Sequence, residues 1–136
     1  MSNIEQTLSI IKPDAVERNI ENEIKLMFKK SGFNILKEKK IQIEKQEAEK
    51  FYKVHETKPF YNDLCSYLSS GPIVVMILEK EGAVKANREI MGSTNPVDAA
   101  EGTIRKKFGI SIDKNSVHGS DSIENAKIEI DFFFKD

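Results

Sequence analysis

Three stretches of the chain have the apolar patterning that is typical of β-strands. The run 8–11 is mostly apolar and ends two residues before a proline, which cannot donate to a strand ladder. The run 73–78 is entirely apolar and follows a Gly-Pro pair, so we expect a buried strand. The stretch 35–43 carries the basic cluster 37–40. We interpret this cluster as the solvated face or edge of its strand.

Apolar residues three or four positions apart predict amphipathic helices in four segments. Gly32 ends the first segment, and Asp121 with Glu124 would form a capping box before the last. A further helix follows the run 73–78, and the segment 92–114 shows no obvious regular structure, so we expect a long loop there. The apolar positions are Ile20, Ile24, Met27 and Phe28; Ala48, Phe51, Tyr52 and His55; Phe60, Leu64, Tyr67 and Leu68; and Ile123, Ala126, Ile130 and Phe133.

The resulting order of elements predicts one domain of mixed α and β structure over residues 1–136. A hydrophobic content of 39% argues against disorder, and the single Cys65, expected to be at least partly buried, cannot form an internal disulfide. There is no basic leader and no apolar run near the ~18 residues of a membrane span, so we expect a cytoplasmic protein without membrane association. A net charge of −1 does not favour nucleic-acid binding.

The run 115–121, Asn-Ser-Val-His-Gly-Ser-Asp, places one of two histidines in a setting typical of a nucleophile. Gly119 is expected to leave the ring of His118 uncrowded, and neutral imidazole is a good nucleophile that needs no activating base. The N-terminus of the helix that follows would favour a phosphate nearby. The alternative is an ordinary loop histidine, since most histidines do no chemistry.

Three more motifs accompany this run: Ile11-Lys12-Pro13-Asp14, Thr94-Asn95-Pro96 and Gly102-Thr103-Ile104-Arg105. Together the four resemble those of the nucleoside diphosphate kinase family. The resemblance extends over about 7–133, nearly the whole chain. It implies a ferredoxin-like α/β sandwich, a four-stranded antiparallel sheet covered by helices. It also implies a ping-pong reaction in which His118 takes the terminal phosphoryl group of a nucleoside triphosphate, usually ATP, and passes it to a nucleoside diphosphate.

The resemblance assigns phosphate and sugar contacts to five polar residues. Lys12 would contact the sugar hydroxyl and the transferred phosphate. Arg88 and Arg105, two of only three arginines, would clamp phosphates, for which a planar guanidinium is suited because it donates two parallel hydrogen bonds. Thr94 would add a hydroxyl donor, and Asn115 would bind the ribose hydroxyl and neighbouring backbone.

The same resemblance implies a base-binding wall. Phe60 and Ile112 would sandwich the base, with Leu64 one helical turn from Phe60. Packing against a flat ring accepts any base, so broad base tolerance is expected. From periodicity alone, Phe60 could equally be a core residue of its helix.

Further residues would support the catalytic histidine. Glu129, with Ser120, would hold one ring nitrogen and leave the other free to attack. Tyr52 and His55 would lie near the histidine and the phosphates, and Gly119 would join the nucleotide site. An ordinary exposed helix glutamate is the alternative for Glu129, and a satisfied structural histidine is the alternative for His55.

Magnesium is the implied cofactor, and it needs no cage of protein ligands because nucleotide phosphates and water supply most of its coordination. Asp121 would assist through water. The sequence has no G-x-x-x-x-G-K-[ST] run, which excludes a P-loop kinase.

Several positions depart from the family pattern. Glu101 stands where proline is common, Ala15 where glycine is common, and 106–107 are lysines where a small residue and an aspartate are common. None removes a catalytic group. The changes leave the conformation of segment 92–114 and its subunit contacts open, so the expected homo-oligomer is a tetramer or a hexamer.

Two functions of different classes are compatible with these observations. The first is an enzyme acting on nucleoside di- and triphosphates. The second is a non-catalytic nucleotide-binding regulatory or scaffold homologue, which would have lost one or more of the reactive side chains. All of these are present, and the enzyme is therefore favoured: Lys12, Arg88, Arg105, Asn115 and His118.

Overall fold

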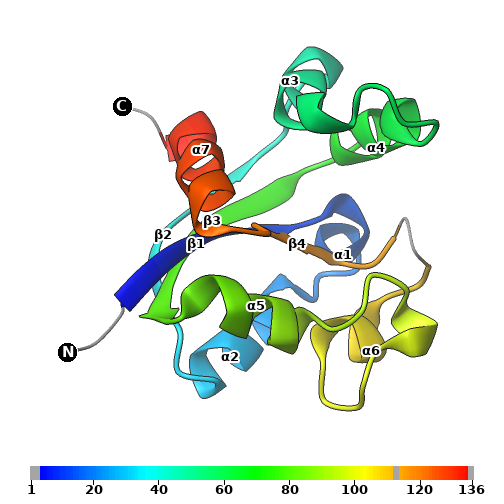
Figure 1. Ribbon diagram of the computed structural model, residues 1–136. Helices are drawn as coiled ribbons and strands as arrows, with labels where there is room; N and C mark the ends of the chain where they lie inside the picture. The colour runs from blue at the N-terminus through cyan, green and yellow to red at the C-terminus, as the bar shows by residue number, and fades with distance from the viewer. Residues whose placement is uncertain (1–3, 112–113, 135–136) are drawn as a thin grey trace.

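A four-stranded antiparallel sheet forms the middle layer of the protein (Figure 1). The computed structural model describes residues 4–111 and 114–134. The strands lie in the order β2-β3-β1-β4, and every neighbouring pair is antiparallel. This arrangement confirms the expected ferredoxin-like sandwich. The strands are β1 (Ile4–Ile11), β2 (Asn34–Ile41), β3 (Ile73–Glu81) and β4 (Val117–Gly119).

Helices cover both faces of this sheet (Figure 1). One face packs against α1 (Pro13–Glu17), α2 (Glu21–Lys30), α5 (Ala83–Met91) and α6 (Ile104–Phe108). The other packs against α3 (Lys45–Phe51), α4 (Tyr61–Leu68) and α7 (Ile123–Phe134). Two 3₁₀ helices, η1 (Lys53–His55) and η2 (Pro96–Asp98), complete the described elements.

The alternation of side chains along the strands produces two apolar cores. On β3, Val74 and Met76 join the core under α2 and α5, whereas Ile73 and Val75 join the core under α3, α4 and α7. Because both faces of β3 are buried over residues 73–78, that part of its sequence is continuously apolar, as predicted. Cys65 is fully buried in the second core, which confirms the expected buried thiol.

The predicted edge strand is confirmed, but its end is not where the sequence placed it. The cluster 37–40 is exposed on β2, an edge strand of the sheet. β2 ends at Ile41 rather than at residue 43, and Glu44 is the N-cap residue of α3. There the Glu44 side chain accepts from the backbone of Glu47, whose own side chain accepts from the Glu44 N–H.

Three local expectations were wrong or incomplete. The segment 92–114 is not devoid of regular structure, because it contains η2 and α6, and Thr103 caps α6 by accepting from the N–H of Lys106. Ser122, rather than Asp121, accepts from a first-turn amide of α7, that of Asn125, at 3.0 Å. The short helix α1, with Pro13 at its first turn, was not predicted.

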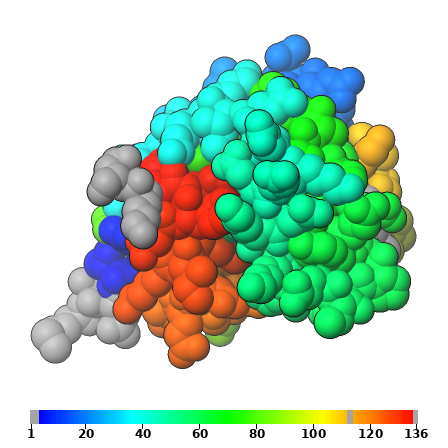
Figure 2. All heavy atoms as spheres, turned by 90° about the horizontal axis from the view of Figure 1, so that it is seen from above, coloured from blue at the N-terminus to red at the C-terminus, as the bar shows by residue number. Residues whose placement is uncertain are grey.

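The helix α7 lies beside the segment formed by α3 and η1 on one face of the molecule (Figure 2). Phe51 at the end of α3 contacts Phe133 of α7, with ring centroids 5.2 Å apart. This contact fixes the side of α7 that faces β4, where the candidate histidine lies. No helix among the described residues is both long and apolar enough to cross a bilayer.

Candidate active site

A pocket of about 850 Å³ is lined by residues from β4, α5, α7, η1 and the end of α3. Most of the predicted site residues line it together, although they lie far apart in sequence. Ser120 does not line the pocket but bonds a residue that does, and Ile112 lies outside the described residues. The predicted residues in the lining are Lys12, Tyr52, His55, Phe60, Leu64, Arg88, Thr94, Arg105, Asn115, His118, Gly119, Asp121 and Glu129.

His118 is fixed by the sheet on one side and by α7 on the other. It lies on β4 opposite Ile10 of β1, and its Nε2 is 3.1 Å from Oε1 of Glu129. Ser120 donates to the same carboxylate oxygen at 2.9 Å. A carboxylate only accepts, so neutral His118 must carry its proton on Nε2. The lone pair of the ring is then on Nδ1.

Two aromatic rings contact the imidazole of His118 at right angles. The ring of Phe51 is 5.3 Å away and that of Tyr52 is 6.3 Å away, measured between centroids. Tyr52 is buried, and burial, assisted by the charge of Glu129, raises the pKa of its phenol well above the ordinary value. Tyr52 therefore stays a neutral hydroxyl at any physiological pH.

Lys12, Asn115 and Thr94 form a connected polar group at the end of β1. Lys12 Nζ donates to Asn115 Oδ1 at 2.9 Å, and Asn115 Nδ2 donates to the carbonyl oxygen of Thr94 at 3.0 Å. Lys12 and Asn115 are both buried. The group thus holds an ammonium and a carboxamide in defined positions on the wall of the pocket.

The two arginines of the pocket differ in their surroundings. Arg88 is exposed on α5, whereas Arg105 is buried and donates to the carbonyl oxygens of Gly92 at 3.0 Å and Val117 at 2.9 Å. Burial, and then the nearby charge of Arg88, lowers the pKa of Arg105 to about 10, so it remains a cation at neutral pH. Arg105 has a structural role that sequence reasoning did not anticipate.

Asp121 is the carboxylate best placed to act outside the His118 pair. Asn125, one turn further along α7, donates to Asp121 Oδ1 at 2.6 Å. This bond, together with smaller contributions that include the charge of Arg88, lowers the pKa of Asp121 below its usual value. No group of three or more His, Cys, Asp or Glu side chains in the described part of the chain is arranged to hold a metal.

Phe60 and His55 form the mouth of the pocket. Phe60 is 44% exposed at the start of α4, which argues against the alternative of a core role. Lys58 Nζ lies 5.6 Å from the Phe60 ring centroid. Desolvation, and then the charge of Lys58, lowers the pKa of His55, which favours a neutral ring.

Gly119 allows two elements to pack closely. A Cβ at this position would overlap Nδ2 of Asn87 and approach Cε of Met91 to 2.7 Å. The glycine therefore allows α5 to pack closely on β4. Phe51 and Tyr52 contact the ring of His118 from other elements, and the expectation that Gly119 itself leaves this ring uncrowded stays a prediction.

Some lining residues were not predicted. Phe51 and Asn125 could have been found, since Phe51 lies on the predicted helical face of Tyr52 and Asn125 lies one turn from Asp121. Val54 and Ile128 are exposed apolar residues at the rim. A single exposed apolar residue on a helix has no distinctive sequence signal.

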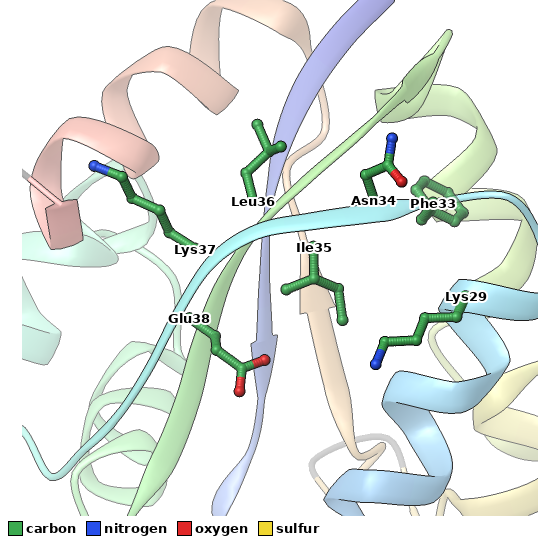
Figure 3. A pocket seen from close by; sticks show the side chains of 7 residues that line it. All are labelled: Lys29, Phe33, Asn34, Ile35, Leu36, Lys37 and Glu38. Carbon is green, nitrogen blue, oxygen red and sulfur yellow. The ribbon is translucent and has the colours of Figure 1, made fainter.

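A second, shallower pocket of about 460 Å³ lies between α2 and β2 (Figure 3). The strand bulges between Ile35 and Lys37, and Ile35 and Glu38 project toward the side of α2 that carries Lys29 (Figure 3). The lining contains no histidine or cysteine. The pocket around His118 is therefore the candidate active site, because its lining includes two histidines.

Two solved structures that match the fold closely are kinases. The chain superposes on the nucleoside diphosphate kinase of Aquifex aeolicus with a TM-score of 0.95 and 41% identity, covering 97% of this chain and 96% of that one. The nucleoside diphosphate kinase of Encephalitozoon cuniculi superposes with a TM-score of 0.93 and 34% identity. That match covers 97% of this chain and 90% of the other. Fold and similarity together define the class: the protein is a kinase, a phosphoryl-transferring enzyme.

Sequence comparisons specify the family. The family model described as nucleoside diphosphate kinase matches residues 5–136. Two relatives with that description are each 57% identical to this chain. The match to the Campylobacter jejuni protein covers 97% of this chain and 96% of the relative. The match to the Rhizorhabdus wittichii protein covers 96% of this chain and 94% of the relative. The chain belongs to the nucleoside diphosphate kinase family.

Proposed function

We propose that the protein transfers the terminal phosphoryl group of a nucleoside triphosphate, usually ATP, to a nucleoside diphosphate through a phosphohistidine at His118. The observation that carries this proposal is the 3.1 Å contact between Nε2 of His118 and Glu129. It supports Nδ1 as the nitrogen with an available lone pair, in a ring that lines the large pocket.

The transfer occurs in two displacements at one site. Nδ1 of His118 attacks the terminal phosphorus, the N–P bond forms, and the bond to the bridging oxygen breaks, so a nucleoside diphosphate leaves with its electron pair. The proton on Nε2 stays in place, and Glu129 stabilises the positive ring that results. An oxygen of a second nucleoside diphosphate then attacks the phosphorus, the N–P bond breaks, and a nucleoside triphosphate leaves. The electron pair of the broken bond returns to Nδ1, so the ring is neutral again.

Five further side chains would stabilise the transferred group and the sugar. Lys12 and Asn115 are hydrogen-bonded to each other in the pocket wall, which supports a joint contact with ribose and phosphate. Arg88 is exposed and adjustable, whereas Arg105 is fixed by two carbonyl oxygens. Each charge-assisted hydrogen bond to a phosphate would contribute about 1.5–3 kcal/mol. Thr94 would add a hydroxyl donor.

The chemistry of the pocket fits a magnesium ion that is held mainly by the nucleotide. Asp121 is a lining carboxylate whose pKa is lowered, and it would hold the ion through water. The ion would neutralise phosphate charge when bound.

The exposed ring of Phe60, with Leu64 beside it, would provide one apolar wall for the base. Ile112 would provide the opposite wall. Because stacking does not depend on the edge groups of a base, we propose weak discrimination among the four common diphosphates.

We also propose a cytoplasmic homo-oligomer, a tetramer or a hexamer, that binds neither nucleic acid nor membrane. Its edge strand β2 and the exposed Leu26 and Leu36 support an association surface. Light scattering after size-exclusion chromatography would distinguish the two assemblies. A monomer at micromolar concentration would contradict the assignment.

The test of the reaction is an intact-mass measurement at neutral to basic pH after the protein is mixed with Mg·ATP. We expect one added phosphoryl group per chain, which disappears after GDP is added. His118→Ala should bind nucleotide but never acquire the group. If the wild-type protein binds ATP without any adduct, the role of His118 is wrong and the non-catalytic nucleotide-binding homologue becomes the better description.

A further inference from the structure

A left-handed turn immediately precedes the strand of His118. Ser116 has a φ of 76°, a conformation that residues other than glycine rarely adopt, and it is fully buried. It joins Asn115, a wall residue of the pocket, to Val117 and the catalytic strand. The conformation of this one residue therefore sets the relative positions of Asn115 and His118.

The hydroxyl of Ser116 is held by an ion pair whose carboxylate is buried. Ser116 Oγ donates to Asp14 Oδ2 at 3.2 Å and accepts from Nη2 of Arg18 at 3.2 Å. Arg18 also pairs directly with Asp14 at 3.3 Å. The side chain of Asp14 is only 4% exposed, so its bond with Ser116 is shielded from competing water, whereas the side chain of Arg18 is 36% exposed.

Other elements fix this ionic group in turn. The hydroxyl of Tyr67, on α4, donates to Asp14 Oδ1 and accepts from the backbone N–H of Asp14. Arg18 donates to the carbonyl oxygen of Phe108 at the end of α6, at 2.6 Å. Ser116 is thus anchored to α1, α4 and α6 at once, and a small rotation of its side chain would break several bonds.

The same turn connects to the lysine of the pocket. The backbone N–H of Lys12 donates to the carbonyl oxygen of Ser116 at 2.8 Å, and Lys12 Nζ donates to the side chain of Asn115. Ser116 is therefore linked directly to both residues. A backbone hydrogen bond links it to Lys12, and a peptide bond links it to Asn115.

We propose that Ser116, held by Asp14 and Arg18, is a positioning residue for phosphoryl transfer. Its hydroxyl fixes the left-handed turn that aligns Lys12 and Asn115 with His118. A glycine would adopt the same φ without strain. The presence of a buried, fully engaged serine instead indicates that the hydroxyl contributes to the geometry of the site.

This inference rests on the proposed phosphohistidine reaction, and its test uses that reaction. Ser116→Ala keeps the Cβ and removes the hydroxyl, whereas Ser116→Gly also removes the backbone strain. We expect both to lower the single-turnover rate of phosphorylation by Mg·ATP by about tenfold, within the range for residues that orient a reactive group. The final stoichiometry should remain one phosphoryl group per chain.

The stoichiometry separates positioning from simple damage to the fold. A variant that is partly unfolded would give fewer phosphorylated chains. A variant with a mispositioned site would still be phosphorylated in every chain, but more slowly. Ser9→Ala is the matched control, because Ser9 is a fully buried β1 serine whose hydroxyl has no hydrogen-bond partner among the described residues. It should keep the wild-type rate.

Asp14→Asn provides an independent variant, since it weakens the partner of the Ser116 hydroxyl. Adding Ser116→Ala to it should slow the reaction less than the same change does in the wild-type protein, because the two changes remove one shared interaction. A wild-type rate in either Ser116 variant would overturn the inference, and so would a fall in stoichiometry that accounts for the lost rate. If the wild-type protein itself acquires no phosphoryl group, the proposed reaction fails instead.

Discussion

The carboxylate of Glu129 lies 3.1 Å from Nε2 of His118 and selects the ring nitrogen that carries the proton of the neutral imidazole. The two residues are eleven positions apart, one on a three-residue strand and the other on the helix that follows. Ser120 donates to the same oxygen and accepts from the N–H of Leu8, which ties the pair to β1. The position of the carboxylate is therefore set by strand and helix together.

Replacing Glu129 by Gln tests this selection. A carboxamide can donate to Nε2, which would stabilise the tautomer with its proton on Nδ1 and remove the nucleophilic lone pair. We expect the rate of phosphorylation to fall roughly 10–100-fold, as for other residues that orient a reactive histidine. Rapid-quench measurement with Mg·ATP gives this rate. The control is Glu124→Gln, which changes an exposed glutamate on the same helix and should leave the rate unchanged. An unchanged rate in Glu129→Gln would make Glu129 an ordinary helix residue.

Phe60→Ala tests the base wall. The ring is 44% exposed at the mouth of the pocket, so its loss should disturb the fold little and cost about 1–3 kcal/mol of nucleotide binding. Calorimetric titration with ADP, GDP, CDP and UDP should show weaker binding for all four bases. If only one base were affected, recognition would depend on the edges of the base rather than on stacking.

The two pocket arginines should separate stability from binding. Arg105→Lys loses a bidentate bridge between Gly92 and Val117 in a buried place, so the free energy of unfolding should fall by about 1–3 kcal/mol. Arg88 is on the surface, so Arg88→Lys should change the free energy of unfolding by less than about 0.5 kcal/mol. Urea unfolding measures both. Nucleotide affinity should decrease in both variants, and equal stability of the two would show that the carbonyl bonds of Arg105 contribute little.

Much of the fold was predictable because burial imposes simple patterns. The run 73–78 is apolar since both of its faces are covered, and the lysines of β2 are tolerated since that strand is an edge. The helix α6 was missed because five residues make little more than one turn and give no periodicity. The start of α7 was misplaced because Asp121 and Ser122 are both good caps, and only the structure distinguishes them.

The site was predictable as a set of residues but not as an arrangement. The motifs identified the side chains that gather around His118, yet periodicity could not show that Arg105 donates to the carbonyl oxygens of Gly92 and Val117. The contact between Gly119 and Asn87 was equally hidden, because it depends on how closely α5 packs on β4. Such tertiary contacts between distant residues leave no local pattern in the sequence.

The tyrosines should make the protein sensitive to alkali. Burial raises the pKa of Tyr52, and burial with the hydrogen bond to Asp14 raises that of Tyr67. The folded chain therefore holds these protons more tightly than the unfolded chain, where tyrosine ionises near pH 10. Their contribution to stability is full below about pH 10 and is lost as the pH rises further. Absorbance at 295 nm and urea midpoints between pH 8 and 11.5 should show both effects, and phenol ionisation near pH 10 in the folded state would contradict them.

Gly119→Ala should reveal how tightly α5 packs against the strand of His118. The new methyl group would overlap Nδ2 of Asn87 and Cε of Met91, so we expect a loss of about 1–3 kcal/mol in the free energy of unfolding. Asn87→Gly removes one of the overlapping groups and should restore part of that loss when the two changes are combined, although it destabilises α5 on its own by roughly 0.5–1 kcal/mol. Urea unfolding of the two single variants and the double variant gives the coupling energy. A coupling near zero would mean that α5 simply moves away from the strand. The close approach of α5 would then not be what requires glycine beside His118.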